Sequence, residues 1–363
     1  MTILTLTDTA AASPTLITWI EGIAMAFPGG GGAGGAEPNG RINILVNPGT
    51  VQERRTVLDF ATNAPIGLAE HNACLFVAWQ SPDDVRRINL TYSLGGLFKP
   101  GEAEQNLTTF DETAASGVSI ISYLDRLLLA WCGGPGLGGG EDNNRVNLAW
   151  SDTGFDWAGG VKLTWRPENK ITRPNRSAFR PALASWPTRE KDYYQPGKKL
   201  GVFWVDQDKS GLLSVAQALD DDFASLQPYD AQQVARVVRA EGAPPADLVR
   251  DPAPILLDAG VSAATTEDGL CLTSINRINT YDEDGNITSW VNGLAIMSGT
   301  TGSATDKFDV VPAMYHLNTS TQTSDFAPGV AMSANIHGPN ETVVAWVGTD
   351  AHRTLNTAHP SDL

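Results

Sequence analysis

The stretch TVVAWVGTDAHRTLNTA, from Thr342 to Ala358, decides the fold because versions of it recur along the chain. It consists of an apolar segment that ends near a tryptophan, a polar turn, and a second segment with asparagine between apolar residues. Such repetition is typical of solenoids and propellers. The related copies are LFVAWQSPDDVRRINLTYS from Leu75, LLLAWCGGPGLGGGEDNNRVNLAWS from Leu127, LGVFWVDQDKSGLLSVAQA from Leu200 and a fainter GIAMAFPGGGGAGGAEPNGRINILVN from Gly22.

Further strands flank these copies. A short strand of small residues precedes each one, such as PIGLA near Gly67, and several are followed by a fourth strand, such as RRTVLDF from Arg54. Four short antiparallel strands per unit are typical of a propeller blade. The tryptophan spacing predicts six units, of which the fifth, around GLCLTSIN from Gly269, is degenerate. We therefore predict an all-β, six-bladed β-propeller of four-stranded antiparallel blades.

The blade boundaries follow from these copies and predict a single domain over residues 1–363. Too few residues follow Asn356 for a fourth strand, so the N-terminal ILTLTD is expected to pair with the chain end and close the ring. Helical apolar spacing followed by prolines predicts a loop and helix insertion at about 231–256. The predicted blades span about 13–60, 64–113, 116–170, 179–230, 258–311 and 326–363, the last completed by 1–8.

Composition limits the partners. The chain has 41 acidic and 25 basic side chains, a formal charge of -16, which argues against nucleic acid. No apolar stretch is long enough for a transmembrane helix, so we expect no membrane insertion. The start MTILTLTD has no signal-peptide features, which predicts a cytoplasmic protein and leaves non-classical release open. The five histidines have no metal-site spacing and the acidic loops lack an EF-hand glutamate, so neither metal nor cofactor is predicted.

The repeated Trp-x-x-x-Asp pattern supplies candidate ligand residues. An aromatic ring can lie against the C–H face of a pyranose, and Asp, Arg or Asn can bond its hydroxyls. Packing between blades for the tryptophans and turn formation for the aspartates are the alternatives. Arg41, which also precedes an asparagine strand, could join Arg87 and Arg145 in a cluster for carboxylate or sulfate, or lie on the outer surface. The candidates are Trp79, Asp83, Arg87, Trp131, Arg145, Trp204, Asp208, Trp346 and Asp350.

The repeats resemble those of bacterial lectin propellers related to the Photorhabdus fucose- and galactose-binding lectins, in which a W-x-G-x-D turn precedes an LNVA-like strand. Those lectins usually have seven blades, and most copies here lack the glycine. WSDTGFDW, with Asp152, Gly154 and Trp157, and FRP at Phe179 to Pro181 are similar to motifs of the six-bladed sialidases. The resemblance implies a propeller that recognises carbohydrate.

Three functions remain open at this stage. The first is a non-catalytic, lectin-like protein that binds glycans or another small ligand between blades. The second is a glycoside hydrolase or other enzyme with its active site at the central channel mouth, where the sequence assigns no catalytic residue. The third is a protein-interaction scaffold. The sequence carries no signal of the oligomeric state.

Overall fold

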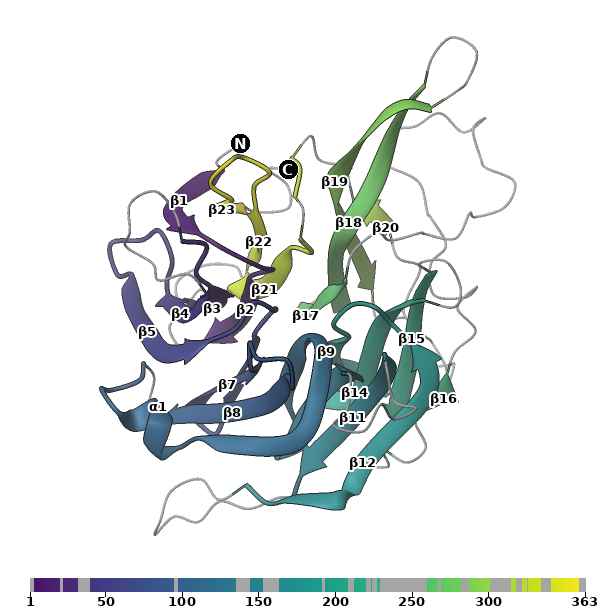
Figure 1. The fold of residues 1–363 in the computed structure, drawn as a ribbon. Helices are drawn as coiled ribbons and strands as arrows, with labels where there is room; N and C mark the ends of the chain where they lie inside the picture. The colour runs from purple at the N-terminus through teal and green to yellow at the C-terminus, as the bar shows by residue number, and fades with distance from the viewer. Residues whose placement is uncertain are drawn as a thin grey trace.

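Antiparallel strands make up nearly all of the regular structure in the computed structural model (Figure 1). The single helix in the described part is the one-turn α1 (Glu102–Gln105). The structure describes residues 3–19, 22–31, 40–94, 97–134, 144–152, 163–190, 193–207, 212–219, 223, 227–228, 260–266, 269–281, 287–300, 315–317, 322–324, 326–333 and 341–358. The predicted insertion at 231–256 lies outside these residues.

The strands form five sheets. One contains β2 (Thr15–Trp19), β3 (Gly22–Pro28), β4 (Arg41–Val46) and β5 (Arg54–Ala61). The seven-stranded sheet contains β6 (Gly67–His71), β7 (Cys74–Gln80), β8 (Arg87–Leu94), β9 (Thr108–Tyr123), β10 (Arg126–Gly133), β11 (Arg145–Ser151) and β12 (Trp165–Arg176). A third sheet contains β13 (Ala182–Glu190), β14 (Tyr193–Asp206), β15 (Leu212–Leu219) and β16 (Gln227–Pro228). A fourth contains β17 (Ser262–Thr266), β18 (Gly269–Tyr281), β19 (Ile287–Thr300) and β20 (Tyr315–Leu317). The last contains β21 (Gly329–Ser333), β22 (Glu341–Val347), β23 (Thr354–Ala358) and β1 (Leu4–Thr9).

The long strand β9 joins two four-stranded units into the seven-stranded sheet. Its first part pairs with β8 and its second part with β10, so it is the last strand of one unit and the first strand of the next. Gly117 lies between the two parts with φ +100°, and a Cβ there would come within 2.6 Å of the Pro65 carbonyl oxygen. Only glycine fits this close approach without strain.

The two ends of the chain share a sheet. Strand β1 pairs with β23, with Leu4 opposite Thr357 and Thr5 opposite Asn356, and the two termini lie near each other in Figure 1. The predicted pairing of the chain start with the chain end is therefore present. The buried Asp8 carboxylate adds a salt bridge from β1 to Arg55 on β5 of the neighbouring sheet.

The first strands of the units surround a common centre. Strand β2 contacts β6, β6 contacts β9, β9 contacts β13, β13 contacts β17, β17 contacts β21, and β21 contacts β2 again. The remaining strands of each unit extend outward from this centre (Figure 1). Such an arrangement of antiparallel sheets is propeller-like.

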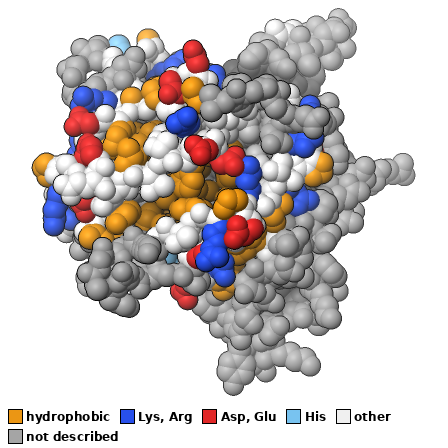
Figure 2. All heavy atoms as spheres, turned by 60° about the horizontal axis from the view of Figure 1, so that its bottom comes forward, with side chains coloured by type: hydrophobic (Ala, Val, Ile, Leu, Met, Phe, Trp, Pro, Cys, Tyr) orange, Lys and Arg blue, Asp and Glu red, His pale blue; other side chains and the backbone are white. Residues whose placement is uncertain are grey.

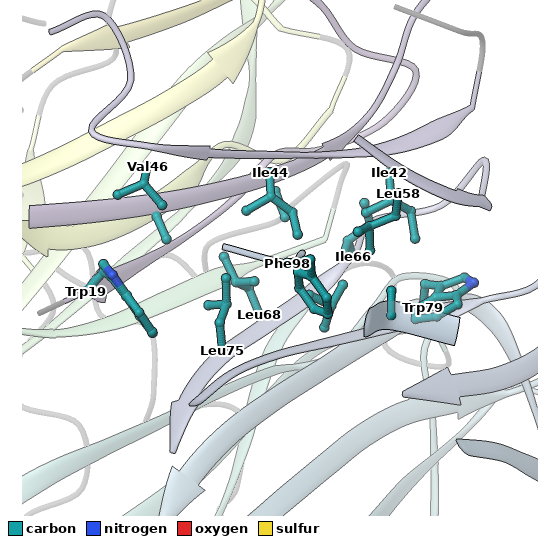
Figure 3. Packing of buried hydrophobic residues seen from close by; sticks show 14 residues of the cluster. Trp19, Ile42, Ile44, Val46, Leu58, Ile66, Leu68, Leu75, Trp79 and Phe98 are labelled. Carbon is teal, nitrogen blue, oxygen red and sulfur yellow. The ribbon is translucent and has the colours of Figure 1, made fainter. Parts of the chain in front are cut away.

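The apolar core lies between neighbouring sheets. Figure 3 shows one cluster, in which Ile42 and Ile44 from β4 face Leu75 and Trp79 from β7. The Trp79 ring also stacks on Phe60 of β5 at a centroid distance of 4.9 Å. Because both faces of each sheet are covered in this way, the second strands of the units read as continuous apolar runs.

The recurring asparagine has a structural role in the sheets. Asn43, Asn89, Asn147 and Asn356 each pair with the aromatic residue of the repeat, and each lies where the ladder to the outermost strand shifts register. In all four, Nδ2 donates to the carbonyl oxygen two residues earlier, at 2.8 to 3.2 Å. This bond satisfies a backbone group beside the irregularity, which explains why the repeat carries asparagine there.

Candidate functional site

The four candidate tryptophans belong to the packing between sheets. Trp79, Trp131, Trp204 and Trp346 are at most 2% exposed. The Lys170 ammonium lies 5.6 Å from the Trp131 ring centroid. Buried rings cannot lie against a sugar, so the packing alternative describes these residues in this structure. Their predicted role in ligand binding stays a prediction without support from this geometry.

The candidate aspartates that the structure describes form turns. Asp83 accepts hydrogen bonds from the Ser81 hydroxyl at 2.7 Å and from the Arg86 backbone N–H at 2.8 Å, and these bonds hold its pKa below the usual value. Asp350 accepts bonds from the His352 and Thr354 backbone N–H groups. Asp208 lies outside the described residues. Turn formation therefore accounts for Asp83 and Asp350.

The arginines that precede the asparagine strands do not converge on the centre. Arg41, Arg87 and Arg145 begin β4, β8 and β11, each the third strand outward from the centre. Arg41 forms an ion pair with Asp59 at 3.0 Å. None of the three lines the cavities described below.

A cavity of about 420 Å³, the channel cavity, lies between the first strands of all the units. Its wall contains apolar side chains and hydroxyl groups from these strands, and its charged lining residues in the described part are Glu70 and Arg180. The hydroxyls also connect neighbouring units: Thr15 Oγ1 donates to the Ile66 carbonyl oxygen at 2.6 Å. The walls of the channel cavity are thus held by bonds between units.

Arg180 lines both the channel cavity and the second cavity described below. Its Nη1 donates to Thr15 Oγ1 at 2.8 Å and to the Ile66 carbonyl oxygen at 2.9 Å, and its Nη2 approaches Ser262 Oγ at 3.4 Å. Thr15 and Ser262 lie in β2 and β17, and Ile66 directly precedes β6, so the partners come from three other units. Burial lowers the pKa of Arg180 to about 10, still well above neutrality, so the guanidinium is charged. No ion pair of the described residues includes Arg180.

Beyond Arg180 lies a second cavity of about 360 Å³, the mouth cavity, where the chain enters the first strands. Phe179, Phe326 and Pro65 contribute apolar surface, and Arg86 contributes a second guanidinium. The side chain of Gln80 accepts a bond from the Gly117 backbone N–H at 2.9 Å. The remaining lining residues are Ala12, Ser13, Asn63, Ala64, Ala115, Ser116, Gly260, Val261 and Ala327.

A third cavity of about 240 Å³, the rim groove, lies where β8, α1 and the start of β9 approach the start of β12. Tyr92 and Trp165 supply aromatic rings, and Trp165 is held edge-on against Phe110 at a centroid distance of 5.3 Å. Asn106 Nδ2 donates to the Tyr92 carbonyl oxygen at 2.9 Å. The groove is lined by Leu90, Tyr92, Gln105, Asn106, Leu107, Thr108, Leu163 and Trp165. Figure 2 turns the side with β8, β9 and β12 toward the viewer and shows hydrophobic side chains between charged ones.

None of the residues that line the mouth cavity or the rim groove was among the sequence candidates. Within the described ranges no group of three or more His, Cys, Asp or Glu side chains is arranged to hold a metal ion. No helix in the described part is long and apolar enough to span a membrane.

The fold defines a class of propeller-like, all-β proteins. No protein-family model matches the chain, and a comparison with curated proteins finds no match. Among solved structures it is similar to AofleA from Arthrobotrys oligospora, with 9% identity, a TM-score of 0.52, and coverage of 96% of this chain and 83% of that one. It is also similar to the SapL1 lectin in complex with alpha methyl fucoside, with 10% identity, a TM-score of 0.53, and coverage of 97% and 94%. At this identity the likeness shows a shared fold.

Proposed function

We propose that the chain is a carbohydrate-binding, six-bladed β-propeller, and that the rim groove between its second and third blades binds a sugar ring. The observation that carries the proposal is the combination of Tyr92 and Trp165 with Gln105, Asn106 and Thr108 around one surface groove. Aromatic rings suit the C–H face of a pyranose, and amides and hydroxyls suit its hydroxyl groups.

Two observations support six blades. The seven-stranded sheet divides at Gly117 of β9 into two four-stranded units, which join the four other sheets. The six first strands contact one another in a complete cycle. The pairing of β1 with β23 completes the last unit, as a propeller closed by its N-terminal strand requires.

The fold and the size of the groove support the sugar. A structural neighbour is a lectin in complex with alpha methyl fucoside. The groove, at about 240 Å³, is smaller than the roughly 300–1,000 Å³ of pockets for drug-sized ligands, which suits one sugar ring. The proposed site differs from the predicted ones, because Tyr92 and Trp165 are partly buried at the edge of the core and neither is one of the repeated tryptophans.

The described residues favour a protein that binds the glycan and does not hydrolyse it. Hydrolysis at the channel mouth would need a pair of carboxyl groups beside the glycosidic bond. The described residues that line the mouth cavity include Arg86 and Arg180 and no Asp or Glu. The same glycans are therefore tested for both binding and turnover.

The test is a glycan array followed by titration of the best ligand with two variants, Trp165→Ala and Gln105→Ala. Loss of one aromatic contact is expected to weaken binding by about tenfold. Gln52→Ala, at an exposed glutamine that does not line the groove, is the matched control and should bind as the wild type does. Unchanged binding in both groove variants, with unfolding midpoints equal to that of the wild type, would exclude the groove. If the protein turned over the glycan, the proposal of binding without catalysis would be wrong.

A further inference from the structure

Strand β5 (Arg54–Ala61) has an outer edge to which no strand in the described part of the chain pairs. Its inner edge pairs with β4, with Val46 opposite Arg54 and Arg41 opposite Ala61. Figure 1 shows β5 at the periphery of the molecule, as the last strand of its sheet. The outer edge of a strand presents backbone N–H and C=O groups with which another strand can pair. A further strand can therefore be added to the sheet at β5.

The other outermost strands in the described part have features that hinder pairing between chains. Strand β12 contains Pro167 and Pro174, and β16 and β20 are two and three residues long. The outer part of β9 carries Asp111 and Glu112 and no basic residue, and the only charged residue of β1 is Asp8. Prolines, short strands and charges of one sign all disfavour edge-to-edge pairing of identical strands. Among the described outermost strands, only β5 is long, lacks proline and carries charges of both signs.

The charges of β5 are placed so that two copies of the strand complement each other. When two copies pair antiparallel with Val57 opposite Val57, Arg55 of each copy lies opposite Asp59 of the other, because both are two residues from the centre. A two-fold axis through this point keeps these side chains on the same face of the joined sheet. A register moved by two residues places Arg55 opposite Val57 or Ala61 and loses both charge pairs. Opposite charges directly across an antiparallel pair stabilise it, so the charges favour one register.

The two charged side chains of this pair stay accessible, although each already forms an ion pair within the chain. Asp59 contacts Arg41 at 3.0 Å, and its side chain is 72% exposed. Arg55 contacts the Asp8 carboxylate through Nη2, and its side chain is 30% exposed. A guanidinium has five N–H donors, so Arg55 can bind a second carboxylate. Both side chains can therefore meet a partner across the edge.

Exposed apolar side chains gather at the hairpin that contains β5. Val57 is 37% exposed, and Val51, in the turn before β5, is fully exposed. Leu4 is 39% exposed and lies against Gly49 of the same turn. These three are half of the six large apolar side chains that are exposed in the described part. A second copy centred on Val57 would cover apolar surface at the middle of the strand.

We propose that the outer edge of β5 pairs with β5 of a second copy of this chain, antiparallel and centred on Val57, so that one sheet continues through the dimer. Backbone hydrogen bonds between the strands supply affinity, and the two pairs of Arg55 with Asp59 fix the register. The occupant is a second copy because the charges of β5 complement those of β5 itself. The inference does not rest on the proposed sugar binding.

The first test is cross-linking of Val57→Cys under mild oxidation with copper phenanthroline. Residues directly opposite in an antiparallel pair have Cα atoms about 4.5–5.5 Å apart, within the range of a disulfide. We expect a covalent dimer on a non-reducing gel for Val57→Cys and none for the wild type, whose Cys74, Cys132 and Cys271 are buried. Val51→Cys is the matched control, because this residue is more exposed but lies outside the paired strand, and its cross-link should be lost.

The second test is sedimentation velocity of the full chain from about 1 to 200 μM. The mass of the wild type should approach that of two chains as the concentration rises. Asp59→Lys places a positive charge opposite Arg55 of the other copy and should weaken dimerisation by about tenfold. Asp84→Lys makes the same change of charge at an exposed residue outside β5 and should shift the dimerisation constant by less than about twofold.

Three results would overturn the proposal. A wild type that is monomeric at every concentration would leave the edge of β5 to a strand of another protein. Equal cross-linking of Val57→Cys and Val51→Cys would mean that the chains meet by random collision. A dimer that Asp59→Lys and Asp84→Lys weaken equally would mean that the copies join elsewhere. Equal thermal unfolding midpoints of Asp59→Lys and Asp84→Lys would show that a difference in dimerisation does not come from misfolding.

Discussion

Replacing Val57 by threonine should make the protein more stable. Besides the bond that Nδ2 donates, three of the four recurring asparagines accept a hydrogen bond at Oδ1, from the hydroxyl of a threonine directly opposite on the outermost strand. The distances from Thr109, Thr172 and Thr5 are 2.8, 2.7 and 2.9 Å. The fourth asparagine, Asn43, faces Val57, and its Oδ1 is buried without a partner.

The size of the effect follows from this comparison. A buried acceptor without a hydrogen bond costs about 1–3 kcal/mol, and threonine has nearly the shape of valine, so Val57→Thr adds the missing donor without a cavity or a clash. The lost methyl group costs less than about 0.8 kcal/mol, because Val57 is already 37% exposed. We expect a net gain of about 1 kcal/mol in the free energy of unfolding.

The assay is equilibrium unfolding in guanidinium chloride, in which the midpoint should rise by about 0.2–0.3 M at an unchanged slope. Thr109→Val is the reverse control and should lower the midpoint, because it leaves the Oδ1 of Asn89 without its partner. In an Asn43→Ala background, Val57→Thr should give no gain. A neutral or destabilising Val57→Thr, together with a neutral Thr109→Val, would refute the idea that this side-chain pair stabilises the sheets.

Three further predictions concern stability. Asp8→Asn breaks the bridge from β1 to Arg55 and should cost about 1–3 kcal/mol in chemical unfolding, whereas an unchanged midpoint would mean that the bridge contributes nothing. Burial lowers the pKa of His71 below 6.5, so the unfolded chain binds a proton that the folded chain does not, and stability should fall as the pH drops below about 6.5. When unfolding is measured at several pH values, His71→Gln should make the free energy of unfolding depend less on pH. An unchanged dependence would mean that other groups cause it. Gly117→Ala should lower the free energy of unfolding by about 1–3 kcal/mol more than Gly101→Ala does. Both glycines have positive φ, but only at Gly117 would the new Cβ clash with backbone atoms. Equal losses in the two variants would contradict this.

The strands and the pairing of the chain ends were accessible from the sequence because the repeat is long and regular. The apolar run, the tryptophan and the asparagine recur together, and the structure pairs Trp79 with Asn89 and Trp346 with Asn356 as two adjacent strands. The joining of two units by β9 was not predicted. The glycine between the two parts of β9, Gly117, has a positive φ and lies close to Pro65, and a single glycine among 36 gives no signal of this.

The candidate site was not accessible in the same way, because a repeated residue is usually repeated for a structural reason. Every unit must fill the space to its neighbour, so the most regular aromatic residue, as in Trp79 and Trp346, is the one that the packing requires. The rim groove instead combines Trp165 with Tyr92 from a strand far away in the sequence. Only the geometry of adjacent units brings those two rings together.

A comparison of equivalent positions between the units directs attention to the mouth cavity. In each unit that has the aromatic residue of the repeat, one residue of the first strand pairs with the residue just before that aromatic residue, as Thr15 pairs with Ala26. Two residues before that position, four units carry Ser13, Pro65, Gly117 and Ala327. The fourth unit carries Arg180 at the same place. These compact residues leave space at the centre, and the long side chain of Arg180 extends into it and bonds to partners from three other units. In a repeat protein, positions that every unit shares therefore describe the packing, and the single unit that departs from them marks where a specific function is to be sought.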